Sequence, residues 1–422
     1  MNESPQPVLP STGEIFRVSL RLGTVGFGGG LTVLSAIRSL CVERRGWLSE
    51  REFVRVATVA QMLPGGAAAN ALAYLGLRFK GNRGALAGYA GFVLPGFLAT
   101  FVLAVIYSSL GVAPSAGLLL DGFNAAVVGI IGSITIQMVR TGIGRLWQMG
   151  LAGGSLLLSL PGGASAGEVA LLGVAVGLIA DLSQKQARLH RYRLRQRTAP
   201  VALPHGGDLL PEEDPAPRSA DREPPGSGQI PLAAVAFAGG AGLHLTGLDA
   251  QLFRIFVTFF RTGLGAYGGG FAIVPHLQGV LVGQHWLTAR QFADSVAIGK
   301  LTPGPVLLMG TFAGYLLGGP LPALAATVGI FLPPFLLVIA LGAWLDRVRQ
   351  SRTVRAALRG LTPAVVGLMA AAAVTMGRTL DGPVAIAIAI AVGLTLQRFR
   401  MDPVFLIAAG GIARLAAGLL GG

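Results

Sequence analysis

The stretch RLGTVGFGGG at residues 21–30 reappears as RTGLGAYGGG at residues 261–270. The likeness continues in the same order along both halves, and the offset drifts only from 240 (261 minus 21) to 238 (329 minus 91). The further pairs are WLS (47–49) with WLT (286–288), QMLPGG (61–66) with KLTPGP (300–305), and GFVLPGF (91–97) with GIFLPPF (329–335). Such order at a nearly fixed offset indicates two copies of one repeat.

The composition around this repeat is that of a membrane protein. Hydrophobic residues make up 52% of the 422 residues and charged residues 12%, whereas roughly a quarter of a soluble protein is charged. From Gly84 to Val139 the only formal charge is Asp121, so this stretch alone can supply two spans of roughly 20 residues. A single cysteine, Cys41, excludes a disulfide framework and a thiolate-rich metal site.

Apolar segments divide each repeat into about six parts. They fall at 14–40, 53–79, 85–110, 116–139, 146–160 and 166–182, and again at 251–281, 291–317, 321–345, 354–377, 383–397 and 404–420. We therefore distinguish a polar tail (1–13), a first repeat (14–183), a basic and then Pro- and acid-rich linker (184–229), an extra apolar segment (230–248) and a second repeat (249–422). The predicted fold is an all-α polytopic membrane protein of about 13 segments.

The distribution of positive charge predicts the orientation. Basic residues concentrate in the linker and in alternate loops, which favours a multi-pass inner-membrane protein with the N-terminus and linker in the cytoplasm and the C-terminus in the periplasm. The same distribution argues against nucleic-acid binding, although the net charge is +14. Residues 41–52 fit poorly, because six crossing segments would place them outside although they carry three arginines.

If 230–248 crosses the membrane, an odd number of crossings precedes the second repeat, and the second repeat is then inverted relative to the first, as in many secondary transporters. Broken or re-entrant helices are expected as well. Three consecutive glycines interrupt the first segment of each half, after an aromatic residue, and helix interiors tolerate glycine poorly. These residues are Phe27, Gly28, Gly29 and Gly30, with Tyr267, Gly268, Gly269 and Gly270. Amides freed by a break at the start of a half-helix favour an anion, although close helix packing also uses small residues.

Other candidate anion-binding residues lie near these breaks. Arg21 and Arg261 each precede the aromatic residue by six positions within apolar sequence, and guanidinium groups suit tetrahedral oxyanions. The alternative is that the arginine side chains extend to the membrane interface. Proline and glycine break the second segments as well, and the candidates there are Gln61, Pro64, Gly65, Asn70, Lys300, Thr302, Pro303 and Gly304.

Four carboxylates, Asp121, Glu168, Asp294 and Asp381, are candidates for proton coupling, but each falls near a predicted segment end, where a solvated carboxylate is the simpler interpretation. Enzyme motifs such as HExxH and the Walker lysine loop are absent from the sequence, and the histidines are scattered. We therefore predict a non-enzyme without metal or cofactor.

The paired motifs resemble the chromate ion transporter family in its long, two-repeat form. They are RLGTVGFGGG, ERRGWLSEREF and AQMLPGG in the first half, with RTGLGAYGGG, HWLTARQF and GKLTPGPV in the second. The resemblance implies chromate efflux that confers resistance, driven by the membrane potential or a proton gradient, with sulfate as a competitor. Gly30 and Gly66 stand where that family often has proline.

Two alternatives stay open at this point. The chain could transport sulfate, molybdate or another oxyanion, or it could be a membrane sensor or scaffold that acts through its basic linker. Besides the anion, its expected partners are membrane lipid and, in a homo-oligomer, further copies of itself.

Overall fold

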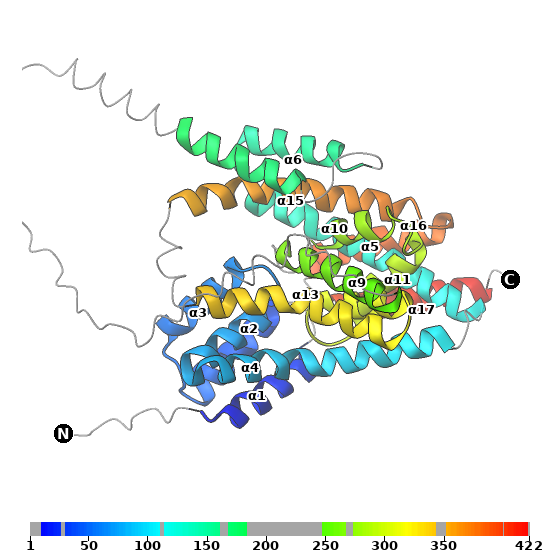
Figure 1. Cartoon of the computed structure of the whole chain (residues 1–422). Helices are drawn as coiled ribbons and strands as arrows, with labels where there is room; N and C mark the ends of the chain where they lie inside the picture. The colour runs from blue at the N-terminus through cyan, green and yellow to red at the C-terminus, as the bar shows by residue number, and fades with distance from the viewer. Residues whose placement is uncertain are drawn as a thin grey trace, which may run out of the picture. The chain divides into compact units, whose positions relative to one another are not determined.

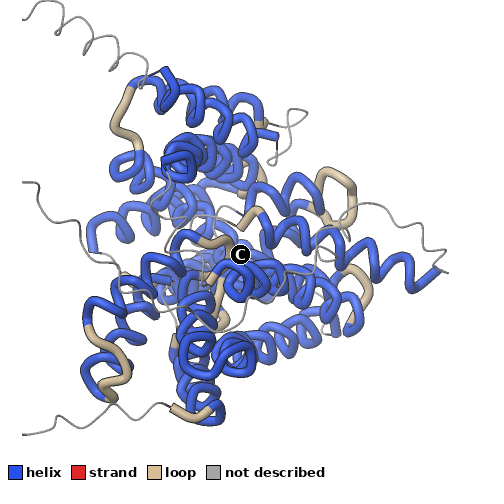
Figure 2. Tube along the Cα trace, turned by 60° about the vertical axis from the view of Figure 1, so that its left-hand side comes forward, coloured by secondary structure: helices blue, strands red, loops and turns tan. Residues whose placement is uncertain are grey.

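The computed structural model describes residues 10–26, 30–109, 114–160, 168–183, 247–266, 273–342, 352–399 and 401–420. These residues form helices joined by short loops, without a strand among them (Figures 1 and 2). One compact unit comprises Met1–Leu178 and His244–Gly422, and a second comprises Ile179–Leu243, of which only 179–183 are described. The predicted linker and nearly all of the extra segment lie outside the described residues.

The two repeats have the same order of elements. In the first repeat these are α1 (Thr12–Val25), α2 (Gly30–Arg38), the π-helix η1 (Ser39–Arg44), α3 (Glu50–Met62), α4 (Ala67–Ser109), α5 (Pro114–Gly142), α6 (Leu146–Leu158) and a helix at 168–183. In the second they are α9 (Gly247–Leu264), α10 (Ile273–Leu281), α11 (Ala289–Leu301), η2 (Val306–Leu308), α12 (Met309–Leu316), α13 (Pro320–Leu341), α15 (Arg352–Gly377), α16 (Gly382–Phe399) and α17 (Pro403–Leu420).

Six helices within the described residues are long and apolar enough to cross a membrane, which confirms the polytopic prediction. Their apolar spans are Ala67–Ser109, Gly117–Gly142, Pro320–Leu341, Arg355–Gly377, Gly382–Phe399 and Pro403–Leu420. The first predicted segment of each repeat and the second segment of the second repeat are absent from this set, and the second segment of the first repeat enters it only as residues 67–79 of Ala67–Ser109.

The first segment of each repeat folds back on itself as a helical hairpin. In the first repeat, Arg45 at the end of η1 forms an ion pair with Glu14 at the start of α1. In the second, the Arg254 guanidinium donates to Gln284 Oε1 at 3.4 Å and lies 4.9 Å from the centre of the Trp286 ring. We call these the first hairpins, α1–η1 and α9–α10. Each first segment is therefore one of the broken or re-entrant helices expected from the sequence, and residues 41–52 lie at the same end of the hairpin as Glu14.

The second segment of each repeat is also a hairpin, broken at the Pro-Gly loop. Arg78 donates to Glu52 Oε1 at 3.1 Å, so the start of α3 meets the end of the 67–79 arm of α4. In the second repeat, Asp294 and Phe312 both contact Tyr107 although they lie on opposite sides of the loop at 302–305. We call these the second hairpins, α3 with the 67–79 arm and α11 with η2–α12.

α4 reverses direction at Lys80 and Gly81, which have non-helical backbone angles. Gly76 packs closely against Gly84, so the 67–79 and 82–109 arms lie side by side. The second repeat makes the corresponding turn at Gly318 and Gly319, which separate α12 from α13 and both have positive φ.

The repeats are inverted, as predicted, because equivalent helices run in opposite directions. The 82–109 arm corresponds to α13 through the GFVLPGF and GIFLPPF stretches. Leu77, just before this arm, lies against Gly342 at the end of α13, while Phe101, near the far end of the arm, stacks edge-on against Tyr315, just before α13 begins. Midway, Tyr89 Oη donates to the Phe331 carbonyl at 3.0 Å. The two arms are therefore antiparallel.

The later helices interlock the repeats. α5 packs against α16 and α17 of the second repeat, and α15 packs against α6 of the first. The crossings are lined with small residues, for example Gly122 against Gly410 and Gly360 against Gly173, which lets the backbones approach closely.

Candidate functional site

The tips of the hairpins meet, and they meet across the repeats. The N–H of Gly65, in the second hairpin of the first repeat, donates to the Ala266 carbonyl at 2.8 Å. The N–H of Gly304, in the second hairpin of the second repeat, donates to the Gly26 carbonyl at 3.2 Å. Gly65 corresponds to Gly304 and Ala266 to Gly26, so one contact is the pseudo-symmetric copy of the other.

A pseudo-two-fold axis passes between the two second hairpins. A Cβ placed on Gly66 would lie 3.1 Å from the Cβ of Pro305. These two residues occupy the same position of the repeat, and equivalent positions can touch one another only near the axis that relates them. The Pro-Gly loops therefore mark the centre of the inverted pair.

The predicted glycines at 65 and 304 have a conformational reason. Their φ angles are +100° and +108°, a region that residues with a side chain rarely adopt. A Cβ on Gly65 would also lie 2.7 Å from the Pro334 Cβ. In the symmetric place a Cβ on Gly96 would strike the carbonyl oxygen of Pro303. Side chains thus fit neither the backbone nor the space at the tips.

Helix N-termini begin at these tips. The 67–79 arm follows Gly66, which has no side chain, and η2 follows Pro305, which makes no side-chain cap hydrogen bond. The first N–H groups of a helix lack intrahelical acceptors and carry partial positive charge. Two uncapped N-termini from opposite repeats can therefore attract an anion at one place.

Asn70 and Thr302 hold the loops that were predicted to bind the anion. The fully buried Asn70 donates through Nδ2 to the carbonyls of Ala60 (3.2 Å) and Pro64 (2.9 Å). The buried Thr302 hydroxyl receives a hydrogen bond from Thr100 at 2.9 Å and contacts the Gly299 carbonyl at 3.4 Å. Both side chains therefore position loop backbone from within the protein.

We expect Asn70→Ala to lower the stability of the folded protein by about 2–3 kcal/mol, because two buried carbonyls lose their donors. The measurement is the midpoint of thermal unfolding of the purified protein in detergent. Gln137→Ala, at an exposed position of α5, is the control. An unchanged midpoint for Asn70→Ala would show that these hydrogen bonds do not hold the loop.

Gln61 and Lys300 occupy the same position of the repeat but have different surroundings. Gln61 is exposed and donates to the Ala57 carbonyl of its own helix at 3.1 Å. Lys300 is 8% exposed near the end of α11, two residues before Thr302. The structure thus buries the one charged candidate of this pair beside the Pro-Gly loop.

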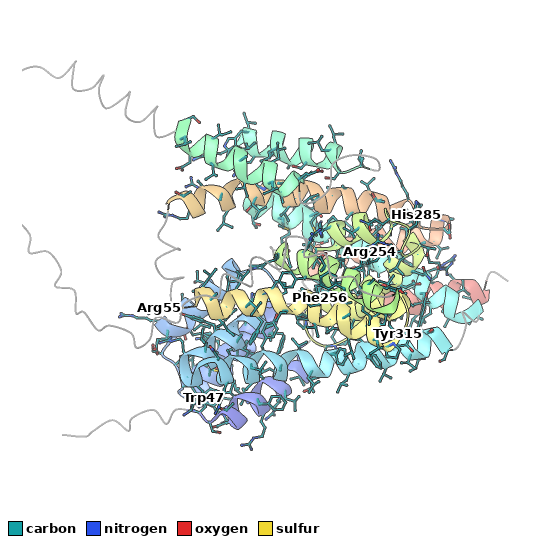
Figure 3. All side chains as sticks on the ribbon, viewed as in Figure 1. Trp47, Arg55, Arg254, Phe256, His285 and Tyr315 are labelled. Atoms are coloured by element: carbon teal, nitrogen blue, oxygen red, sulfur yellow. The ribbon has the colours of Figure 1, made fainter. Side chains whose placement is uncertain are left out.

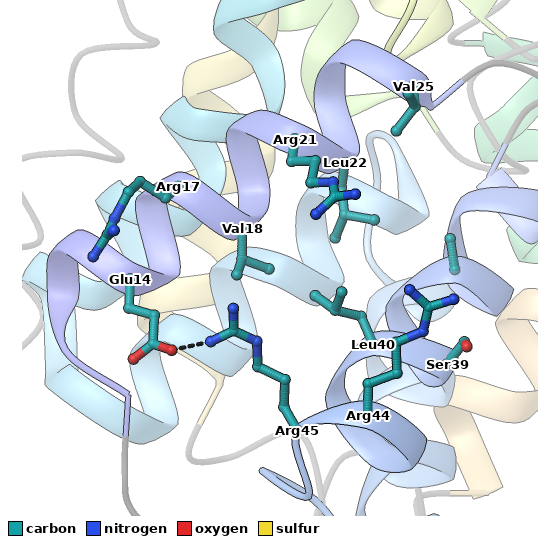
Figure 4. Close-up of a pocket in the computed structure, with 11 residues that line it drawn as sticks. Glu14, Arg17, Val18, Arg21, Leu22, Val25, Ser39, Leu40, Arg44 and Arg45 are labelled. Carbon is teal, nitrogen blue, oxygen red and sulfur yellow. Dashed lines mark hydrogen bonds and ion pairs between the residues drawn. The ribbon is translucent and has the colours of Figure 1, made fainter.

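Arg21 lies in a groove of about 430 Å³ between the two limbs of the first hairpin of the first repeat (Figure 4). Arg17, Arg44 and Arg45 line the same groove, together with Glu14. Arg17, Arg44 and Arg45 were not among the predicted anion-binding residues. The spacing of Arg17 and Arg21, which share a helix face at i and i+4, is a signal that could have indicated Arg17.

The charge of this groove is not repeated in the second half. Arg261 matches Arg21, but the positions equivalent to the other three arginines are Val257, Gly283 and Gln284. Arg261 is exposed near the end of α9. One end of the inverted pair therefore carries an arginine-rich groove, and the corresponding part of the other does not.

The glycine runs are described only at their edges. Gly30 is the first residue of α2, and α10 begins at Ile273. Phe27, Gly28 and Gly29, together with Tyr267, Gly268, Gly269 and Gly270, lie outside the described residues. The described ends, Gly26 and Ala266, are the residues that accept the hydrogen bonds from the Pro-Gly loops.

The matches to known proteins include both repeats. A family model described as "Chromate transporter" matches residues 13–181 and 253–415. A chromate transport protein of Pseudomonas aeruginosa is 29% identical over 86% of this chain and 81% of its own length. One from Cupriavidus metallidurans is 27% identical over 94% and 91%, and a probable chromate transport protein of Synechococcus elongatus is 29% identical over 86% and 84%. No solved structure matches the chain significantly.

Proposed function

Because the chain belongs to the chromate transporter family, we propose that it exports chromate from the cytoplasm across the inner membrane and thereby confers resistance. The observation that carries this proposal is the pair of reciprocal hydrogen bonds between hairpin tips, Gly65 to Ala266 and Gly304 to Gly26. They unite broken helices of two inverted repeats at one centre, which is where secondary transporters bind substrate.

Chromate is a tetrahedral dianion, and the centre offers donors that suit it. The substrate contacts we propose are the first amides of the 67–79 arm and of η2 together with the glycine runs, with Arg21 and Arg261 supplying guanidinium groups and Gln61 and Lys300 assisting. Asn70 and Thr302 keep the loops in place. A site made mainly of backbone amides binds an oxyanion without requiring a metal.

Alternating access follows from the way the tips are shared. Each Pro-Gly loop is bonded to the first hairpin of the other repeat, so movement of one repeat displaces both contacts together. Because the repeats are inverted, rocking that closes the site at one end opens it at the other. Chromate would then reach the two sides of the membrane in turn.

The direction of transport is inferred from the arginine-rich groove. Arg44, Arg45, Arg78 and Lys80 all lie at the end of the first repeat where its hairpins open, and positive charge favours the cytoplasmic side. The N-terminus is then cytoplasmic and the C-terminus periplasmic. Arginines that line one groove concentrate anions at that side, which supports capture from the cytoplasm and export.

The direct test is uptake of radiolabelled chromate into everted membrane vesicles from a chromate-sensitive host. We expect energised vesicles with the protein to accumulate chromate above vector controls, and excess sulfate to inhibit by competition. Separate assays with labelled sulfate and molybdate distinguish the rival oxyanions. Absence of chromate uptake, or faster uptake of another oxyanion, would contradict the substrate assignment, and uptake only into right-side-out vesicles would contradict export.

A further inference from the structure

Asp294 is a fully buried carboxyl group in the second hairpin of the second repeat. Its Oδ2 accepts a hydrogen bond from the Tyr107 hydroxyl and its Oδ1 one from Asn124 Nδ2, both at 2.8 Å. Tyr107 belongs to α4 and Asn124 to α5, so both donors come from the first repeat. One carboxyl group thus joins a hairpin of one repeat to two helices of the other.

This placement corrects the expectation of a solvated carboxylate at a segment end. Asp294 does lie near the start of its predicted segment, on the second turn of α11. The segment is half of a hairpin packed against α4 and α5, so its beginning is covered by protein. The sequence shows that Asp294 is close to the segment end, but it does not show that α4 and α5 bury this end.

The donors to Asp294 are neutral. The charged groups around it come from three elements: Arg290 on α11 is hydrogen-bonded at 2.9 Å to Asp121 of α5, Arg414 of α17 packs beside Gly122, and Lys300 lies farther along α11. Among the described residues, Tyr107 and Asn124 donate hydrogen bonds to Asp294, and Arg290 bonds to Asp121 instead. An ionised carboxylate without a paired cation is costly to bury, and protonation removes that cost.

The surrounding groups can satisfy both protonation states. The ionised carboxylate accepts from Tyr107 and Asn124, as the structure has it. A protonated carboxyl must donate one hydrogen bond, and Asn124 Oδ1 is buried without a partner in the structure. Rotation of the Asn124 amide would bring that acceptor to the carboxyl, because its O and N positions are interchangeable in shape.

The equivalent position of the first repeat carries no carboxyl group. That position is Arg55, which is exposed and points away from the helices (Figure 3). The second hairpin of the first repeat nevertheless forms with the same Pro-Gly tip. The buried acid is therefore present in one repeat only.

We propose that Asp294 takes up and releases a proton in each transport cycle and so couples the movement of the oxyanion to the proton gradient. This rests on the proposed transport function. Ionised Asp294 holds the second hairpin of the second repeat against α4 and α5 through two charge-assisted hydrogen bonds. Protonation weakens both bonds and frees the repeats to move past one another.

The test separates exchange from coupled transport in proteoliposomes that contain the purified protein. We expect Asp294→Asn to retain exchange of labelled for unlabelled chromate, which needs no net proton movement, and to lose accumulation driven by a pH gradient by at least roughly tenfold. In Asp294→Asn, proton flux driven by a chromate gradient and followed with a trapped pH indicator should be lost as well. Asp381→Asn, at an exposed carboxylate, should change neither assay.

Tyr107→Phe provides a second readout that does not depend on removing the acid. Loss of a donor to the ionised form favours the protonated form, so the midpoint of the pH dependence of transport should move to higher pH by about one unit. Accumulation by Asp294→Asn at the wild-type level, or an unshifted midpoint in Tyr107→Phe, would overturn the proposal. Absence of chromate exchange in the wild-type protein would instead refute the proposed transport function.

Discussion

Alanine at Gly304 or at Gly65 is expected to reduce chromate transport by at least roughly tenfold, because the left-handed backbone at each tip is strained by any side chain. The φ angles are +108° and +100°. At Gly65 the added methyl would also lie 2.7 Å from Pro334, and at Gly304 it would lie 3.1 Å from Leu308. Each loop would have to shift, and with it the N–H that bonds to the opposite repeat. The measurement is the initial rate of uptake into everted vesicles, corrected for the amount of protein.

Gly382→Ala is the matched control for these variants. Gly382 has a φ of +81°, and a Cβ there would meet nothing within 4 Å. Alanine at this position therefore carries a similar backbone strain without a clash and away from the tips. We expect it to transport near the wild-type rate. Loss of transport in all three variants would mean that strain alone is responsible, and retention in Gly304→Ala would show that tip geometry does not set the rate.

Replacing either of the two predicted arginines should reduce chromate transport by a similar factor. A charge-assisted hydrogen bond contributes about 1.5–3 kcal/mol, so Arg21→Ala and Arg261→Ala should each weaken the apparent affinity for chromate by roughly 10- to 100-fold. Lysine at the same positions should restore part of the affinity, since it keeps the charge but not the paired geometry. Concentration-dependent uptake gives the apparent affinity and the maximal rate separately.

The exposed Arg83 provides the control for charge alone, and Arg83→Ala should leave the affinity unchanged. Arg21 lies in the arginine-rich groove whereas Arg261 has no such neighbours, so Arg21→Ala should affect uptake into everted vesicles more than Arg261→Ala. If both arginine variants insert normally and transport at the wild-type rate, the arginines are not part of the substrate site.

The duplication, its inversion and the breaks at Pro64 and Pro303 could be predicted from sequence, because each leaves a local pattern or an internal match. Whether each broken segment crosses or turns back could not be decided from sequence. Hydropathy shows that 14–40 is apolar and long enough to cross, whereas in the structure the segment turns back and Arg45 pairs with Glu14. Such a contact between distant charges has no periodic signature.

The sequence predicted many residues of the candidate site but not their hydrogen-bond partners. Gly65 and Gly304 were identified as flexible break points, and the structure shows that their specific partners are Ala266 and Gly26. Asn70 and Thr302 were predicted as anion donors, yet their hydrogen bonds go to the protein's own loops and to Thr100. Asp294 was expected to be solvated and is buried. In each case the deciding partner comes from another part of the chain.

The contact between Gly66 and Pro305 has a consequence for how such a chain can diverge. In a homodimer of two oppositely inserted copies, a residue on the two-fold axis faces its own duplicate, and any substitution there happens twice. Joining the copies in one polypeptide removes that obligation. Glycine can face proline, an acid at 294 can stand where the other copy has Arg55, and four arginines can gather in one groove. A covalently linked pair can thus acquire a preferred sense of operation, which two identical halves, by symmetry, cannot have.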